Sequence, residues 1–411
     1  MDFDVAKHTI YLTLHGSHAY GMARPESDVD VKGICIPPPE YFHGYLKHFE
    51  QFEGQLPRDA AFGQATYVGI LESMVKRQIP EAEPIDSVVY DLRKFFRLAA
   101  DCNPNICEVL FTDPSCHVWA TTLYELLVGH RDEFLSTKAK FSFCGYAHAQ
   151  LKRIRTHRAW LLNPPKGKPT RADYGLPEHT VIPRDQLMAA ESLITRKLEE
   201  WLGSQEELPK DVLHDMRQRT VHAIRDIWAA LAADCFTWVD KGSGEKILEL
   251  LAPPITEDGD LDDQKICHAA GKLLGYDSNF LEVLDRERGY RSALKQFNQY
   301  EEWKRSRNPA RAALEEKHGF DTKHGSHLKR LLDMAKEIVE EGKVVVKRPN
   351  AEELLAIRNG AWSFDQLLEW ATRREEELDA LYESGKSPLP KKPDHAKLDA
   401  LCRRMAEESM R

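Results

Sequence analysis

The N-terminal third of the chain contains several short stretches in which hydrophobic and polar positions alternate. Residues 8–16 and 27–36 are rich in β-branched and aromatic residues, and a glycine or a run of prolines closes each stretch. Alternation with a period of two predicts strands with one buried face. Residues 84–105 begin with the same pattern and change to a helical period before an Asn-Pro pair, which predicts a strand followed by a helix. The pattern of residues 64–77 is compatible with either a strand or a helix.

Helical periodicity dominates the rest of the chain. Two amphipathic helices are expected at residues 117–135 and 146–162, before a basic loop rich in proline and glycine. The expected architecture is therefore α+β: a mixed sheet with helices in residues 1–165, followed by an all-α domain in residues 166–411. In that second part, a period of about 3.6 residues predicts helices at residues 184–203, 212–236, 246–252, 281–305, 327–342, 364–385 and 395–409.

Composition limits the classes of function. The 411 residues suffice for two or three domains, and the formal net charge of −9 argues against a general electrostatic clamp on nucleic acid, although it is compatible with a local basic groove. The eight cysteines are irregularly spaced, the N-terminus lacks the pattern of a secretory signal, and no apolar run is long enough to span a membrane. A cytoplasmic protein with reduced thiols and no membrane partner is the expected class.

Two aspartates, Asp28 and Asp30, stand one residue apart in the second predicted strand. Because side chains alternate along a strand, both carboxylates point to one face, while Val29 and Val31 point to the core. Two carboxylates on one face repel each other unless a cation compensates. Oxygen ligands of this kind suit Mg²⁺ or Mn²⁺ together with substrate phosphates, so the pair is a candidate metal site. The alternative is a solvated strand edge next to a Ser-Asp turn.

The first predicted strand leads into Gly16 and Ser17. A glycine in such a turn lets a backbone amide approach an oxyanion, and the serine hydroxyl adds a donor. A phosphate-binding turn followed by a metal-binding strand is the arrangement needed to hold a nucleoside triphosphate with its metal. The sequence contains no Walker-type phosphate loop, no dinucleotide fingerprint and no Gly-x-Ser-x-Gly elbow.

The stretch HGSHAYGMARPESDVDVKG, residues 15–33, resembles the Gly-Ser…Asp-x-Asp motif of the polymerase-beta-type nucleotidyltransferase superfamily, in particular its bacterial and phage RNA-ligase-associated branch. The resemblance continues in YDLRKFFRLAADCNPNICEVLF, in FCGYAHAQLKRI, and in QYEEWKRSRNPARAALEEKHGFDTKHGSHLKRLL together with the later LLAIRNG. It implies a polymerase-beta-like domain that moves a nucleoside monophosphate from an NTP, with ATP among the expected nucleotides, to an acceptor hydroxyl. It also implies an RNA 3′ end as acceptor, in RNA repair or processing, and an RNA ligase as a partner.

The resemblance further implies a third carboxylate on a neighbouring strand, which would act as a base for the attacking hydroxyl or bind metal. Asp86 and Asp91 are the candidates. Asp91 stands where a helix is expected to begin, and a carboxylate there has a ready structural role as a cap. Asp86 is favoured for this reason, so the expected metal ligands and catalytic residues are Asp28, Asp30 and Asp86.

The stretch FDTKHGSHLKR, residues 320–330, is the most unusual part of the helical region. Asp321 or Thr322 can cap a helix that begins after Gly319, and two histidines three residues apart share one face of that helix. Such a pair without a third ligand is weak as a metal site and is more often structural. Because this block belongs to the resemblance, we expect four of its residues to bind nucleotide or acceptor across a groove from Asp28: Lys323, His324, His327 and Arg330. Further candidates are Arg307, Asn308 and Arg311.

Three other groups have competing explanations. The spacing of Cys102, Cys107, Cys116 and His117 does not suit a zinc site, and buried free thiols explain the cysteines better. Glu108 could face the active site or the solvent. A basic wall for phosphates and a solvated surface are equal alternatives for eight residues: Lys152, Arg153, Arg155, His157, Arg158, Lys166, Lys168 and Arg171.

Two other functions compete with transfer to RNA. One is the same chemistry on a protein or a small molecule, and the other is a catalytically inert nucleotide- or RNA-binding module. An intact aspartate pair argues against the inert module, because a protein that only binds has no need to bear the repulsion between the two carboxylates.

Overall fold

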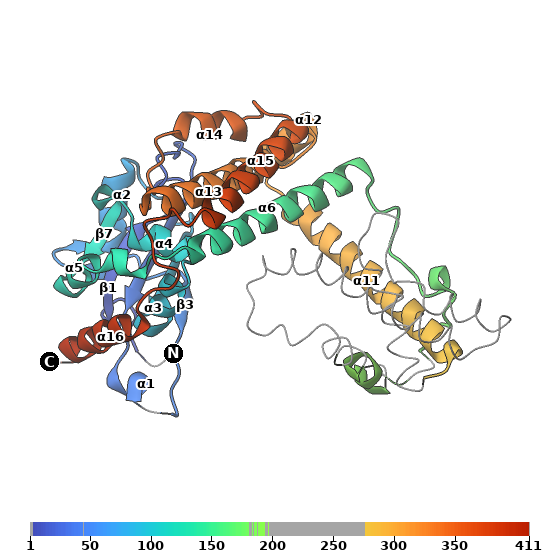
Figure 1. Cartoon of the computed structure of the whole chain (residues 1–411), viewed down its shortest axis with the longest axis horizontal. Coiled ribbons are helices and arrows are strands. Elements are labelled where there is room, and N and C mark those ends of the chain that lie inside the picture. Colours follow the sequence, from blue (N-terminus) through green and yellow to red (C-terminus); the bar gives the residue numbers. More distant parts are fainter. Residues whose placement is uncertain are drawn as a thin grey trace. The chain divides into compact units, whose positions relative to one another are not determined.

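The computed structural model describes residues 3–43, 45–180 and 276–410, with isolated positions between 183 and 196. The chain forms two compact units, one of residues 1–161 with 310–411 and one of residues 162–309. The first unit contains the sheet expected from the sequence and also the last helices of the chain (Figure 1). The α+β fold class is confirmed. Among the described helices, none combines the length and the apolarity needed to cross a membrane.

A five-stranded sheet in the order β3-β6-β2-β1-β7 forms the centre of the first unit. Strand β2 pairs with β6 in parallel, whereas the β1–β2, β3–β6 and β1–β7 pairs are antiparallel. The strands predicted from residues 8–16, 27–36 and 84–91 are thereby confirmed. The bounds of the five strands are β1 Thr9–Leu14, β2 Val29–Cys35, β3 Gln51–Gly54, β6 Ile85–Asp91 and β7 His117–Ala120.

Helices cover both faces of this sheet. On one face, Leu12, Val29 and Val31 pack with Tyr67 and Leu71 of α2. On the other face, residues of the sheet such as Ile34 pack with apolar residues of the helices that follow β6 and β7. The elements of this part are α1 Pro39–His43, the short hairpin β4 Ala61–Phe62 and β5 Ala65–Thr66, α2 Tyr67–Val75, α3 Leu92–Ala100, α4 Pro104–Leu110 and α5 Thr122–Val128.

The C-terminal helices return to the sheet and to α6 (Figure 1). Helix α13 packs with α6 and α15 around a core that includes Phe143, Leu328 and Leu367. Leu398 and Met405 of the last helix join the core on the sheet face that carries α3 and α5. The bounds of these helices are α6 Lys138–Leu162, α12 Pro309–His318, α13 Thr322–Glu341, α14 Ala351–Arg358, α15 Phe364–Glu383 and α16 His395–Ser409.

The second unit contains α11, which runs from Ser278 to Ser306, and a short 3₁₀ turn at Ala172–Tyr174. Arg171 before this turn donates from Nη1 to Oε2 of the buried Glu287 at 3.0 Å. The helix predicted at residues 281–305 is confirmed by α11. The helices predicted at residues 212–236 and 246–252, and most of the one at 184–203, lie outside the described residues.

The single helix predicted at residues 117–135 is wrong. Residues 117–120 form β7, the helix α5 begins only after Thr121, and residues 131–134 form a 3₁₀ turn. Pairing with β1 overrides the helical period here: Trp119 donates from its indole nitrogen to the Thr9 carbonyl at 3.2 Å, and Thr121 donates to the Ile10 carbonyl at 3.1 Å. The ambiguous residues 64–77 form mainly the helix α2, which Thr66 caps.

Two structural roles expected from the sequence are confirmed. Cys102, Cys107 and Cys116 are buried free thiols. Asp91 is the N-cap of α3 and accepts the backbone N–H groups of Arg93 at 2.8 Å and Lys94 at 3.2 Å. Its carboxylate is buried, so its hydrogen bonds satisfy a group that would otherwise be costly to desolvate.

We expect Asp91→Ala to lower the free energy of unfolding by about 1–2 kcal/mol, because it removes a buried helix cap. Asp86→Ala is the matched control, since Asp86 is an exposed aspartate on the same strand. Urea denaturation of both variants at pH 7 measures the difference. An equal loss in the two variants would contradict the assignment of the cap to Asp91 alone.

Candidate active site

Asp28 and Asp30 lie at the beginning of β2. Val29 and Val31 are 1% and 0% exposed, so the alternation predicted from the sequence holds and the valines face the core. Asp28 is exposed just before the strand, and Asp30 is half-buried on the same sheet face as Lys32. The strand therefore presents its carboxylates away from the apolar core that holds the valines.

Asp86 lies directly beside Asp30. The two residues are register partners in the parallel β2–β6 pair, so their side chains share a face of the sheet. Asp91, the other candidate, is five residues further along β6 and is engaged as the cap of α3. The structure thus brings Asp28, Asp30 and Asp86 into one region, but among the described residues their carboxylate oxygens do not form a set within 4.8 Å of one another.

Gly16, in the turn after β1, lies directly against the carboxylate of Asp30. Its φ of +62° is left-handed, and a Cβ atom on it would stand only 2.8 Å from Oδ2 of Asp30. Only glycine meets both conditions without strain. The turn is held by backbone bonds from His15 N–H to the Asp30 carbonyl at 2.8 Å and from Met22 N–H to the Ser17 carbonyl at 2.8 Å. Gly16 therefore lies against the Asp30 carboxylate, and the half-buried Ser17 follows it in the same turn; phosphate binding by this turn remains a prediction.

Electrostatics at Asp30 show that this region has an excess of negative charge. Burial raises the pKa of Asp30, and the carboxylates of Asp28 and Asp86 raise it further, while Lys32 and Lys323 act in the opposite direction. Three carboxylates that raise the proton affinity of one of their members form a set that a divalent cation would stabilise. All-oxygen donors next to an open surface fit Mg²⁺ or Mn²⁺, so Asp28, Asp30 and Asp86 are suited to hold that ion.

Basic residues from the C-terminal helices face these aspartates. Lys323, at the start of α13, is exposed, and its pKa is lowered by desolvation and by the charges of Arg311 and Arg358, against the effect of Asp28 and Asp30. Burial and then Arg24 lower the pKa of Arg358, the last residue of α14, whereas Asp28 raises it. The start of α13 and the end of α14 therefore supply positive charge beside the carboxylates.

A buried ion pair lies behind the exposed groups. Arg330 of α13 donates to Oε1 of Glu108 of α4, and the two side chains are 3% and 1% exposed. The Tyr20 hydroxyl donates to Oε2 of Glu108 at 2.5 Å, and the Arg330 guanidinium lies 3.8 Å from the centre of the Tyr20 ring. The open question about Glu108 is settled: it faces the interior. Arg330 is engaged in this pair and does not project to the surface.

Two histidines lie next to this pair: His15 is buried and His327 is half-buried. Nε2 of His15 lies 3.5 Å from Glu108, and the pKa of His15 is lowered well below its usual value by burial and by the positive charges of Lys32 and Arg330. Burial and then Arg330 lower the pKa of His327 in the same direction. Both imidazoles are therefore neutral near pH 7, which avoids further positive charge around Arg330.

His324 lies in a different environment from Lys323. Burial lowers its pKa to about 4, so His324 is neutral near pH 7 and Lys323 supplies the charge at the start of α13. Of the two caps that the sequence allows, Asp321 and Thr322, Asp321 caps α13 by accepting the N–H of His324 at 3.1 Å. Burial alone would raise the pKa of Asp321, but His157, His324 and Arg311 outweigh it and hold the pKa well below its usual range.

The remaining basic candidates are dispersed. Arg311 donates to Asp321, and Arg307 lies 4.3 Å from the ring centre of Trp303 in the second unit. On α6, Arg158 donates to the Gly319 carbonyl at 2.8 Å, so it stabilises the entry to α13. The residues of α6 that are exposed for contact with a polyanion are Lys152, Arg153 and Arg155.

Sequence reasoning missed five residues of this region: His15, Tyr20, Arg24, Lys32 and Arg358. The first four lie inside or beside the quoted motif of residues 15–33, and a polar residue at a strand position, as at Lys32, was the available signal. Arg358 lies in the stretch LLAIRNG that takes part in the resemblance, but its relation to Asp28 depends on the packing of α14.

Comparison with known proteins finds a family match in the part of the chain that contains these aspartates. Residues 3–162 match the model of a family described as RlaP, the RNA repair pathway DNA polymerase beta family. These residues are therefore similar to that family. The resemblance noted in the sequence is thus confirmed for its blocks within residues 3–162, which include the strands that carry Asp28, Asp30 and Asp86. The block that contains the start of α13 lies outside the match.

One curated relative comes from Enterobacteria phage T4 and is described as an uncharacterized 38.9 kDa protein in the nrdC-mobD intergenic region. It is 30% identical to this chain over 152 residues, which cover 35% of this chain and 38% of the phage protein. No solved structure matches the chain.

We expect Gly16→Ala to weaken Mn²⁺ binding, because the added methyl group would displace the carboxylate of Asp30. Gly385→Ala is the matched control: Gly385 has a φ of +64°, and a Cβ on it would meet no atom within 4 Å. Both variants bear the left-handed strain of about 1–2 kcal/mol. Calorimetric titration with Mn²⁺ separates them, and equal affinities in the two variants would show that the Gly16–Asp30 approach does not shape the site.

Asp30→Asn should raise the melting temperature at pH 7 in the absence of divalent ions, because it removes repulsion from Asp28 and Asp86. The pKa of Asp30 is raised in the folded state, so the wild type gains stability as pH falls through that raised value towards 3.8. The advantage of the variant should therefore shrink between neutral and acidic pH. Thermal scans from pH 4 to 8 test this, and a constant difference over that range would contradict it.

Proposed function

We propose that this chain is a metal-dependent nucleotidyltransferase that moves a nucleoside monophosphate from an NTP to an acceptor hydroxyl. The observation that carries the proposal is the register pairing of Asp30 with Asp86, with Asp28 at the start of the same strand and Gly16 against Asp30. The similarity of residues 3–162 to a polymerase beta family described for RNA repair supports the same chemistry.

The residues divide the reaction between them. Gly16 and Ser17 border the phosphates, and Asp28 with Asp30 would hold Mg²⁺ or Mn²⁺. Asp86 orients the acceptor hydroxyl and takes its proton as the oxygen attacks the α-phosphorus and the bond to the pyrophosphate oxygen breaks. The ion, when bound, offsets the charge that develops on the phosphates. Lys323 and Arg358 face the same region and stabilise the negative charge of the leaving pyrophosphate.

The helical part supplies the second wall of the groove in this proposal. Residues 1–165 form the catalytic domain, and the helical region that begins at residue 166 contributes α13 and α14. The effect of Asp28 on both Lys323 and Arg358 supports this role for residues 310–411, which belong to the same compact unit as the sheet. Arg330 positions α13 from the interior and does not touch the nucleotide in this proposal, whereas His324 and His327 are neutral and half-buried.

An RNA 3′ end is the acceptor we propose, with an RNA ligase as the enzyme that acts on the same RNA ends. The family description names an RNA repair pathway, and the exposed Lys152, Arg153 and Arg155 on α6 offer positive charge to a polyanion. Because the net charge of the chain is −9, such contacts are confined to local patches.

Incubation with radiolabelled NTPs and Mg²⁺ tests the proposal, with RNA, protein and small-molecule pools as parallel acceptors. We expect label on RNA 3′ ends. Asp86→Ala should lower the rate of transfer by about 10²–10⁴-fold with little change in nucleotide binding, because it removes the base. Asp399→Ala, an exposed aspartate on α16, is the control and should retain the wild-type rate.

Lys323→Ala should raise the NTP concentration needed for half-maximal transfer and reduce the dependence of binding on salt. Lys336→Ala is its control on the same helix, where Lys336 pairs with Glu377 at 3.1 Å. If the label appears on a protein or a small molecule, the proposed acceptor is wrong but the proposed nucleotide transfer stands. Nucleotide binding without transfer to any pool would instead identify an inert binding module.

A further inference from the structure

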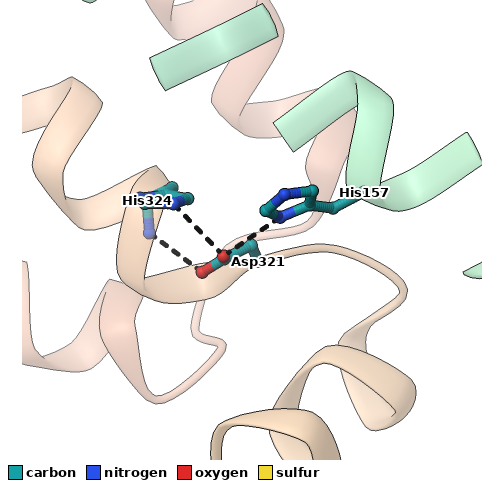
Figure 2. Close-up of side chains that lie close together, drawn as sticks. All are labelled: His157, Asp321 and His324. Carbon is teal, nitrogen blue, oxygen red and sulfur yellow. Dashed lines mark hydrogen bonds and ion pairs between the residues drawn. The ribbon is translucent and has the colours of Figure 1, made fainter. Parts of the chain in front are cut away.

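A second set of metal-binding side chains lies where α6 meets the start of α13. His157 comes from α6, Asp321 precedes α13, and His324 lies in its first turn; Figure 2 shows the two imidazoles turned towards one carboxylate. Asp321 is fully buried and the histidines are half-buried. One ligand atom of each residue lies within 4.8 Å of the other two.

The distances fit coordination better than hydrogen bonding. Nδ1 of His157 and Nε2 of His324 each lie 3.6 Å from Oδ2 of Asp321. This is longer than a good N–H···O bond, which measures about 2.7–3.2 Å. A tetrahedral zinc ion with bonds of about 2.0–2.1 Å holds its ligand atoms roughly 3.4 Å apart, close to the spacing observed.

We propose that His157, Asp321 and His324 form a binding site for a transition-metal ion of the zinc type. Two imidazoles and one carboxylate suit such an ion, whereas Mg²⁺ prefers oxygen donors alone. The three residues leave one position of a tetrahedral ion for water or another ligand. This ligand set shares no residue with Asp28, Asp30 and Asp86.

The carboxylate of Asp321 has room for this ion among its other partners. Oδ1 accepts the N–H of His324 that caps α13, and Oδ2 accepts from Arg311. Each carboxylate oxygen has two acceptor positions, so Oδ2 can bind an ion and keep a second partner. Nε of Arg311 also lies 3.3 Å from Oε1 of the buried Glu315, so the guanidinium retains a carboxylate when Asp321 turns to the metal.

The site joins α6 to the start of α13, two helices that also share a hydrophobic core. An ion bound by α6 and α13 would hold the first turn of α13, and with it Lys323, at a fixed position. The expected role is therefore structural: it fixes the helix start that faces the aspartates. Arg311 competes with the metal ion for Asp321. If no metal ion binds, the Arg311 guanidinium alone neutralises the Asp321 carboxylate.

Metal binding to the full chain, freed of ions by a chelator, tests the site. We expect calorimetry to show one Zn²⁺ bound, and Co²⁺ to give the visible absorption of a tetrahedral nitrogen–oxygen site without a thiolate band. His157→Ala and His324→Ala should each lower the Zn²⁺ affinity more than about 10-fold, because loss of a residue that only supports a metal ligand already costs about that much. His148→Ala is the control on α6, because His148 contacts Glu375 and not Asp321.

All variants are measured in an Asp30→Asn background, so that the all-oxygen site does not contribute. Zn²⁺ should also raise the melting temperature of the parent and of His148→Ala, and not of His157→Ala or His324→Gln. Circular dichroism confirms that each variant folds. No tetrahedral Co²⁺ spectrum in the parent, or equal Zn²⁺ affinity in the parent and His157→Ala, would overturn the proposal and leave Arg311 as the partner of Asp321. These readouts do not depend on nucleotide transfer.

Discussion

The buried ion pair between Glu108 and Arg330 joins the sheet to the C-terminal helices. The two residues are 222 positions apart in sequence and are almost completely removed from solvent. Each charge requires the other, because an unpaired charge in the interior costs several kcal/mol. Tyr20 takes part from the turn after β1, through its hydroxyl bond to Glu108 and its ring against Arg330. One interaction thus holds the Gly16 turn, α4 and α13 in a single arrangement.

The charge balance around the aspartates depends on that arrangement. The parallel β2–β6 register sets Asp30 beside Asp86, and the resulting repulsion is visible in the raised pKa of Asp30. Lys32 comes from the strand itself, whereas Lys323 comes from α13, which the Arg330–Glu108 pair joins to α4. In a chain with a net charge of −9, this local placement of positive groups would favour the approach of an anion to the aspartates and their metal.

Asp321, at the start of α13, has several structural roles at once. Asp321 caps the helix, pairs with Arg311, and has the imidazoles of His157 and His324 on either side. Its low pKa keeps it ionised over the whole physiological range, so the cap and the ion pair do not depend on pH. The helix therefore begins at a defined residue, and Lys323 follows from that position.

The sequence by itself determined what depends on neighbouring residues. Alternation placed the valines of β2 in the core, and side-chain preferences identified Asp91 as a cap and limited the cap of α13 to Asp321 or Thr322, because both signals act over a few positions. It did not determine β7, where pairing with β1 outweighed a helical period. It also left the orientation of Glu108 open, since the partner that buries it lies 222 residues away. The meeting of His157 with Asp321, and of Arg358 with the region of Asp28, was decided only by tertiary packing, because local patterns carry no information about which distant charges will share one environment.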